Sequence, residues 1–142
     1  MRHRVRATVI KCNVDEDLQT QYLADPHSGP CPCFHVGDNY EFWREDDRDD
    51  FWHFGGNECG HFPCAEAWDC ISRYIYAALQ GGAVMSGWTN DERMMIACCN
   101  DGTRPVVFRI EREDVPETDE EHVWLARQDF SNGTNDTDAT GA

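Results

Sequence analysis

The pattern of apolar and polar residues along the chain predicts a mixture of strands and helices. Residues 5–11 are rich in β-branched side chains and predict a strand, and the alternating run 39–43 predicts another. Between them, residues 15–23 predict a short helix, because acidic side chains at its start suit the positive end of a helix dipole. Prolines and glycines interrupt residues 26–37, so this part is expected to form a turn-rich loop.

A longer amphipathic pattern begins at Pro63. Apolar residues recur at steps of three and four positions as far as Leu79, which predicts a helix with one apolar face. Proline in the first turn, and Gly81 and Gly82 after the last turn, agree with the residues usual at helix ends. This segment is therefore expected to be the principal helix.

A predicted hairpin follows this helix. Two short apolar segments, 83–88 and 94–99, lead to a turn at residues 100–102, and an alternating run over 106–111 comes next. Because Asp-Gly between alternating runs is typical of a hairpin, the segments on either side of that turn are expected to pair. The elements predict one α+β domain over residues 4–113, in which a small, mainly antiparallel sheet or half-barrel packs on the principal helix.

Composition agrees with one folded core followed by an acidic tail. A chain of 142 residues suits a single domain, and its five Trp and seven Phe indicate an aromatic-rich interior. Acidic residues and glycines between positions 44 and 61 predict an exposed loop. Residues 114–142 are acidic and poor in apolar side chains, which predicts a mostly disordered tail.

Charge and hydropathy exclude some classes of partner. The formal net charge of -15 opposes binding to nucleic acid or to an anionic membrane, because both are polyanions. No run approaches the roughly 18 apolar residues needed to cross a bilayer, and the first residues do not form a secretory signal. We therefore expect a soluble, cytoplasmic protein.

Eight cysteines are the main candidates for chemistry. In a reducing cytoplasm, metal ligation, redox chemistry and packing of a small apolar side chain compete to explain them. Cys31 and Cys33 lie two residues apart in the proline-containing loop. Cys64 lies in the first turn of the predicted helix, where unpaired N–H groups favour a thiolate. Cys98 and Cys99 are adjacent in a predicted strand, so they face opposite sides and one of them is expected to lie in the core.

Four short blocks carry a resemblance to a known family. They are Ala7-Thr8-Val9-Ile10-Lys11, Pro30-Cys31-Pro32-Cys33-Phe34-His35-Val36-Gly37, Phe62-Pro63-Cys64-Ala65-Glu66-Ala67-Trp68 and Cys99-Asn100-Asp101-Gly102-Thr103-Arg104-Pro105-Val106. Over residues 4–113 the chain resembles a family of small uncharacterised proteins common in anaerobic bacteria and archaea. The resemblance implies that Cys31, Cys64 and Cys99 are the family's cysteines, with Cys99 projecting beside the hairpin turn. Phe62-Pro63 stands where the family has Gly-Phe, and Cys59 has no counterpart.

The cysteines supply enough ligands for a metal centre. Four thiolates satisfy tetrahedral Zn²⁺ or anchor an iron–sulfur cluster, and His35 or His61 can replace one of them. The expected ligands are Cys31, Cys33, Cys64 and Cys99. We expect them to converge at one end of the principal helix, where a metal or cluster site would serve redox or binding.

Two alternatives stay open. One is a metal-free domain that binds an unknown protein partner. The other is a thiol-dependent enzyme, with Cys64 as nucleophile, His61 or His35 as base and Arg104 as a clamp for an anionic substrate. Arg104 fits equally well a simple ion pair with a nearby acid such as Asp101. No motif in the sequence names a substrate or a reaction.

Overall fold

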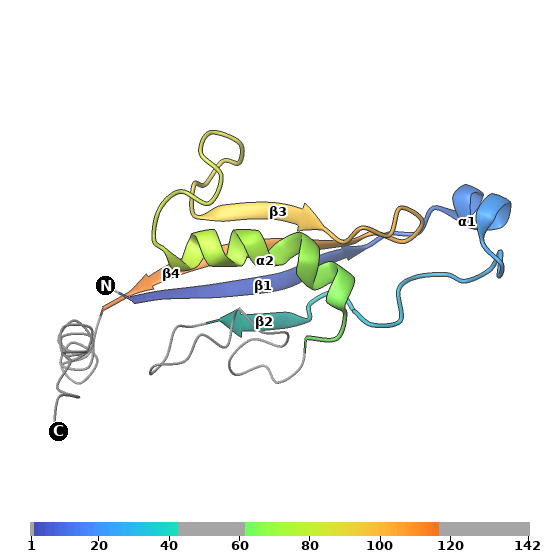
Figure 1. Ribbon diagram of the computed structural model, residues 1–142, viewed down its shortest axis with the longest axis horizontal. Coiled ribbons are helices and arrows are strands. Elements are labelled where there is room, and N and C mark those ends of the chain that lie inside the picture. The colour runs from blue at the N-terminus through green and yellow to red at the C-terminus, as the bar shows by residue number, and fades with distance from the viewer. Residues whose placement is uncertain (1, 43–61, 117–142) are drawn as a thin grey trace, which may run out of the picture. The chain divides into compact units, whose positions relative to one another are not determined.

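Four strands and two helices make up the described part of the chain. The structure is a computed structural model, and it describes residues 2–42 and 62–116. The elements are β1 (Arg2–Cys12), α1 (Glu16–Tyr22), β2 (Asn39–Phe42), α2 (Ala65–Leu79), β3 (Met94–Cys98) and β4 (Val106–Val115), as Figure 1 shows. Nearly all of these residues belong to one compact unit, His3–Asp114, and only this unit is discussed below.

The strands form one open antiparallel sheet with the order β2-β1-β4-β3. Val5 of β1 lies opposite Phe42 of β2, and Met95 of β3 lies opposite Ile110 of β4. The predicted α+β class and antiparallel sheet are confirmed, and the sheet is not closed into a barrel. Strands β1 and β3 flank β4 and point the same way, so their C-terminal ends lie at the same end of the sheet (Figure 1).

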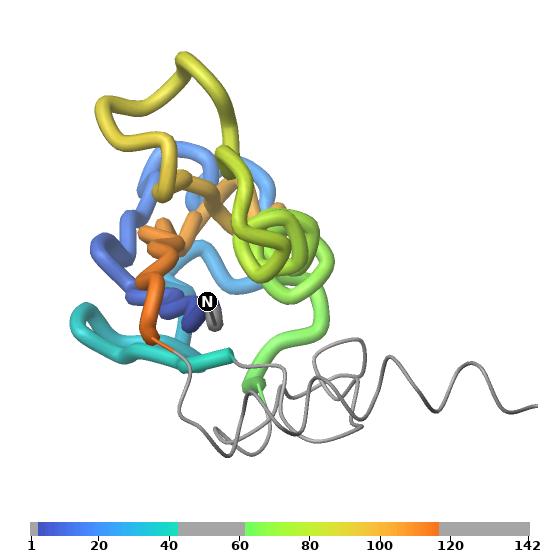
Figure 2. Tube along the Cα trace, turned by 90° about the vertical axis from the view of Figure 1, so that its left-hand side faces the viewer, coloured from blue at the N-terminus to red at the C-terminus, as the bar shows by residue number. Residues whose placement is uncertain are grey.

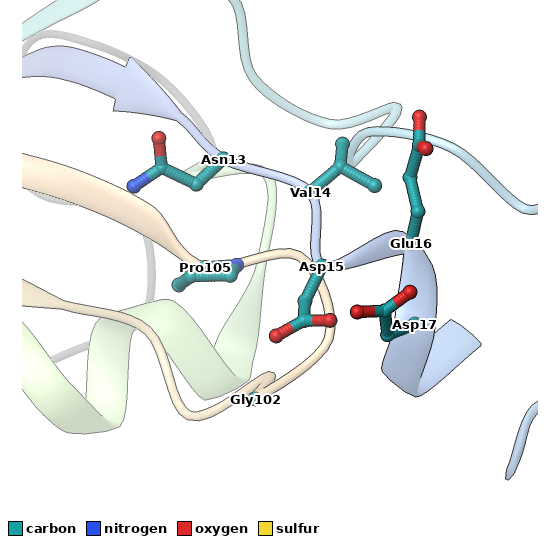
Figure 3. A pocket seen from close by; sticks show the side chains of 7 residues that line it. All are labelled: Asn13, Val14, Asp15, Glu16, Asp17, Gly102 and Pro105. Carbon is teal, nitrogen blue, oxygen red and sulfur yellow. The ribbon is translucent and has the colours of Figure 1, made fainter. Parts of the chain in front are cut away.

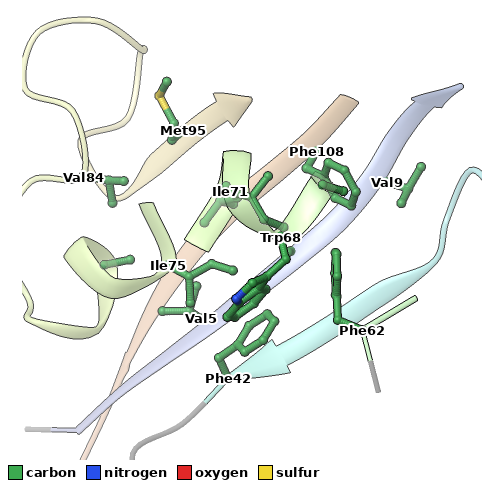
Figure 4. Packing of buried hydrophobic residues seen from close by; sticks show 14 of the residues in the cluster. Val5, Val9, Phe42, Phe62, Trp68, Ile71, Ile75, Val84, Met95 and Phe108 are labelled. Atoms are coloured by element: carbon green, nitrogen blue, oxygen red, sulfur yellow. The ribbon is translucent and has the colours of Figure 1, made fainter. Parts of the chain in front are cut away.

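Helix α2 covers one face of the sheet, and the hydrophobic core lies between them (Figure 2). Side chains alternate along each strand, which is why Val5 is fully buried and its neighbour Arg6 is exposed. Trp68, Ile71 and Ile75 repeat at helical spacing and point into the same core (Figure 4). Full burial of a side chain of this kind contributes about 1.5–3 kcal/mol, so this interface fixes α2 on the sheet.

The ends of α2 differ slightly from the prediction. The helix begins at Ala65, two residues after the predicted start at Pro63, because Cys64 has extended dihedral angles (φ -142°, ψ 120°) and acts as the N-cap. The C-terminal end is confirmed, since Gly81 has a φ of 89° and follows the C-cap Gln80. Only glycine adopts such a conformation without strain, which explains the residue at this position.

Two loops complete the described unit. Residues 83–88 contain bends and turns, and a 2.8 Å hydrogen bond from the Val84 N–H to the Glu92 carbonyl oxygen closes this loop. The loop after α1 is held by Gln19, whose buried side-chain amide exchanges hydrogen bonds of 2.9 Å and 3.0 Å with the backbone of Gly29. Both polar atoms of this buried amide are therefore satisfied.

Two of the predictions concern residues outside the described ranges. The acidic loop predicted over 44–61 lies there, and so does all but the first few residues of the tail predicted over 114–142. Among the helices that the structure describes, none has the length and apolar character needed to cross a membrane.

Candidate functional site

The C-terminal ends of β1 and β3 place two cysteines at the same end of the sheet. Cys12 is the last residue of β1, and Cys99 directly follows the last residue of β3. Both side chains are half-buried against the core. The Cys12 thiol donates a hydrogen bond to the carbonyl oxygen of Phe34 (3.6 Å), and the Cys99 sulfur accepts one from the N–H of Val106 (3.3 Å). The first of these bonds ties the end of β1 to the loop that carries Cys31 and Cys33.

Phe34 anchors that loop in the core. Its side chain is only 2% exposed, and its ring centroid lies 5.5 Å from that of Phe62 and 5.2 Å from that of Phe108. Just before this anchor, Cys31 is half-buried against the core and Cys33 is exposed. The chain turns between the two cysteines, and their side chains share a hydrogen bond. One thiol of the pair thus faces the interior and the other faces solvent.

Electrostatic interactions link five thiols into one group. Cys33 interacts with Cys31 and Cys64, and Cys12 interacts with Cys31 and Cys99. Cys70 in addition interacts with Cys99 and with Cys98. We call Cys12, Cys31, Cys33, Cys64 and Cys99 the cysteine cluster. They come from the end of β1, the loop before β2, the start of α2 and the end of β3. Segments that are far apart in the sequence therefore contribute sulfur atoms to one region of the fold.

Burial and like charge raise the pKa of two thiols in the cluster. Burial is the largest cause of the raised pKa of Cys12, and the charge of a neighbouring Cys31 thiolate adds to it. Burial is also the first cause of the raised pKa of Cys33, followed by Cys31, while the positive charge of Arg104 acts in the opposite direction. These two thiols are consequently protonated at neutral pH unless a bound cation offsets the thiolate charge.

Cys64 lies at the start of α2 without capping it. It is the N-cap residue, and its side chain makes no hydrogen bond to the first N–H groups of the helix. Its half-buried side chain packs against the core beside Cys33. The Cys64 sulfur is therefore not committed to the helix terminus, and it interacts electrostatically with Cys33.

The two adjacent cysteines at the end of β3 differ in burial, as predicted, but the buried one is not the one that the resemblance implied. Cys98 is the exposed one, whereas Cys99 is half-buried and packs against the core. Side chains alternate along β3, so Cys99 lies on the same side as Met95 and Ala97, which face α2. The expectation that Cys99 projects from the core is therefore wrong, although Cys99 does join the cluster through Cys12.

The hairpin turn contains a local ion pair. The Arg104 Nε donates to the Asp101 Oδ2 at 3.1 Å, and the Asp101 Oδ1 accepts bonds of 2.9 Å from both the N–H and the hydroxyl of Thr103. The Thr103 N–H is the largest cause of the lowered pKa of Asp101. The ion pair considered for Arg104 is confirmed. Of the two candidate histidines, His35 has a ring that is 83% exposed and lies 3.8 Å from Asp38, and His61 lies outside the described residues.

All four predicted ligands thus belong to the cluster, and the sequence missed its fifth member, Cys12. In the structure, no three His, Cys, Asp or Glu side chains within residues 2–42 and 62–116 are arranged to hold one metal ion. A signal for Cys12 was present, because it ends the first predicted strand. Its meaning depends on β1 lying beside β4, which local patterns do not reveal.

A separate acidic hollow lies between the start of α1 and the hairpin turn (Figure 3). Its volume is about 530 Å³, and its lining includes Asp15, Glu16, Asp17 and Gly102. The Asp15 carboxylate caps α1 by accepting a 3.0 Å bond from the Leu18 N–H. The acids here are explained by helix capping and by the dipole of α1.

Comparison of the chain with protein-family models, with curated proteins and with solved structures gives no match. The family resemblance described above stays a prediction.

Proposed function

We propose that this domain binds a soft metal ion through thiolates of the cysteine cluster. Zn²⁺ is the first candidate, and an iron–sulfur cluster is the second. The proposed ligands are Cys31, Cys33, Cys64 and Cys99, with Cys12 beside them. A reducing compartment such as the cytoplasm suits this function, because the ligands have to stay reduced.

The observation that carries the proposal is the electrostatic grouping of thiols from four separate parts of the chain. Cys33 interacts with Cys31 and Cys64, and Cys31 is linked to Cys99 through Cys12. Thiolates that repel one another in a partly buried region are stabilised by a bound cation, which offsets their charge. The Val106 N–H donates a hydrogen bond to the Cys99 sulfur, as N–H groups do to the sulfurs of metal centres.

Binding would require small movements of the cluster. Exposed Cys33 lies on a loop between the anchors Gln19 and Phe34, and its side chain is the member with most freedom to turn inward. Metal sites commonly complete their geometry only when the ion binds, since binding and local ordering are coupled. We therefore expect the metal to order residues 30–34 and to exchange thiol protons for the ion.

Two observations weigh against the alternative of a thiol-dependent enzyme. The expected anion clamp, Arg104, is engaged with Asp101. The expected base, His35, is exposed and faces Asp38.

The test is a metal titration of protein purified without oxygen and stripped with a chelator. Co²⁺ serves as a spectroscopic substitute for Zn²⁺, because thiolate ligands give it intense charge-transfer absorption. We expect this absorption in the native protein and a clear loss of it in Cys64→Ser and Cys99→Ser. Cys98→Ser is the matched control, since this neighbouring cysteine is exposed and faces away from the cluster.

Three results decide the proposal. Thiolate absorption that survives in Cys98→Ser and weakens in the two cluster variants supports it. Visible absorption with bound iron and sulfide in the purified protein supports its iron–sulfur form. Absence of both the Co²⁺–thiolate absorption and the iron–sulfur absorption in the native protein, or equal loss in Cys98→Ser and Cys99→Ser, overturns it.

A further inference from the structure

We propose that Cys31 and Cys33 form an exchangeable dithiol that reduces low-molecular-weight disulfides and closes into a disulfide within its own loop. This activity goes beyond metal binding and does not depend on it. The argument rests on the spacing of the two cysteines, on their unequal exposure and on the anchoring of the loop.

The first step of the argument is reach. A disulfide needs two Cα atoms roughly 4.4–6.8 Å apart. Residues two positions apart are separated by at most about 7 Å even in a fully extended chain. Here the chain turns between Cys31 and Cys33, and their side chains already share a hydrogen bond. The spacing therefore allows the two sulfurs to bond.

The second step is the unequal exposure of the pair. Cys33 is exposed and can meet a disulfide in solution, whereas Cys31 is half-buried against the core. In such a pair the exposed thiol attacks first and the inner thiol resolves the product.

The third step is the fixed position of the loop. Phe34 is buried directly after the pair, and its carbonyl oxygen accepts a hydrogen bond from the Cys12 thiol. Gln19 holds Gly29 just before the pair, through bonds of 2.9 Å and 3.0 Å. These anchors keep the two thiols near one another, which favours closure of the Cys31–Cys33 disulfide over persistence of the mixed disulfide on Cys33.

The reaction balances in two exchanges. The Cys33 thiolate attacks one sulfur of the small disulfide, the S–S bond breaks, and the departing thiolate takes up a proton. The Cys31 thiolate then attacks the Cys33 sulfur, forms the Cys31–Cys33 bond and releases the second small thiol. Two electrons and two protons pass from the dithiol to the disulfide, which is the oxidant and is consumed.

The experiment uses the full chain in the presence of a chelator, with bis(2-hydroxyethyl) disulfide as probe. This probe is neutral, so the strong negative charge of the protein does not repel it. Free thiols are alkylated after the reaction, and the chain is cut before aspartates. Peptide 25–37 then contains Cys31 and Cys33 and no other cysteine. We expect it to be two hydrogens lighter and unalkylated.

Variants separate the two roles. Cys31→Ser should retain the probe as a stable adduct on Cys33, because the resolving thiol is missing. Cys33→Ser should lose ring closure and react about tenfold more slowly in this peptide, since its remaining thiol is half-buried. The control Cys98→Ser should form the Cys31–Cys33 disulfide as the native protein does. In the native protein, Cys98 should form only a mixed disulfide with the probe.

The inference is overturned if peptide 25–37 stays fully alkylatable after Cys98 has reacted, or if Cys33 pairs with Cys64 and not with Cys31. Because metal is absent throughout, such a result leaves the Co²⁺ titration unaffected. Ring closure in a protein that fails that titration would uphold this inference and reject the metal site.

Discussion

His3 and Asp114 are the first and last residues of the folded unit, and their side chains are in contact, with 2.6 Å between the His3 Nδ1 and the Asp114 Oδ1. The same Asp114 oxygen accepts a 2.9 Å bond from the Nε of Arg112, whose side chain is only 8% exposed. Arg112 also donates to the carbonyl oxygen of Gly82, just after α2. One carboxylate thus joins the start of β1, the end of β4 and the loop that follows the principal helix.

Replacing Asp114 with Asn should lower the free energy of unfolding by about 1–3 kcal/mol at neutral pH, because Arg112 would be left partly buried without its counter-charge. The hydrogen bond from His3 is the largest cause of the lowered pKa of Asp114. A carboxylate with a lowered pKa stabilises the fold above its ordinary pKa of 3.8, and this contribution disappears as the pH falls through the folded value.

Urea unfolding of the native protein and of Asp114→Asn, measured from neutral to acidic pH, checks this prediction. The difference in unfolding free energy between the two proteins should begin to shrink below about pH 4, where Asp114 of the unfolded chain takes up a proton, and should disappear once the pH is below the lowered pKa of the folded protein. The control is Glu41→Gln, which removes an exposed pair with Arg6 and should cost less than about 1 kcal/mol. An Asp114→Asn effect no larger than that of the control contradicts the assigned role.

Gly81 should be far less tolerant of substitution than Gly87. Both have positive φ, 89° and 73°, but a Cβ at Gly81 would collide with the ring of His3, whereas the space around Gly87 is open. We expect Gly87→Ala to cost about 1 kcal/mol and Gly81→Ala at least about 2 kcal/mol. Urea unfolding measures both values.

A double variant isolates the collision. In a His3→Ala background the ring is gone, so the additional cost of Gly81→Ala should fall toward that of Gly87→Ala. An unchanged cost in that background would mean that the backbone conformation alone, and not His3, makes Gly81 necessary.

The elements were predictable because their signals are local. Alternation over 106–111 and the Asp-Gly turn specify the β3–β4 hairpin, and helical spacing specifies α2. The sheet order was not predictable, since the placement of β1 beside β4 depends on packing between distant segments. The apolar segment 83–88 forms a loop, and its residue Val84 is nevertheless buried in the core.

The residues of the candidate site also differ in whether a local sequence pattern identifies them. Cys31, Cys33 and Cys64 stand beside prolines and a helix start, which are local marks, and the sequence singled them out. Cys12 carries no such mark, and its neighbours appear only when the strands are assembled. The burial of Cys99 could have been predicted, because side chains alternate along a strand and Cys99 lies four residues after the core residue Met95, on the same side.

Phe34 should couple stability to the cysteine cluster. Its ring packs between Phe62 and Phe108, and its backbone follows Cys33 directly. Phe34→Leu should lower the free energy of unfolding by about 1–2 kcal/mol and should weaken Co²⁺ binding, because the loop loses its anchor. Val36→Ala, in the same loop but 65% exposed, should change neither quantity. Equal Co²⁺ binding in both variants would show that the anchor does not position the thiols.

Metal binding to the cluster should release protons. The pKa values of Cys12 and Cys33 are raised above their ordinary value of 9.0, so these thiols are protonated at neutral pH. A metal ligates the thiolate, and Cys33 should therefore release about one proton when the metal binds at pH 7. The apparent affinity should rise about tenfold per pH unit for each ligand that loses a proton.

Proton release is measured by calorimetry in buffers of different ionisation enthalpy. Cys33→Ser should release about one proton fewer than the native protein, and Cys98→Ser should release the same number. A proton count that does not change in Cys33→Ser would remove this residue from the proposed ligands.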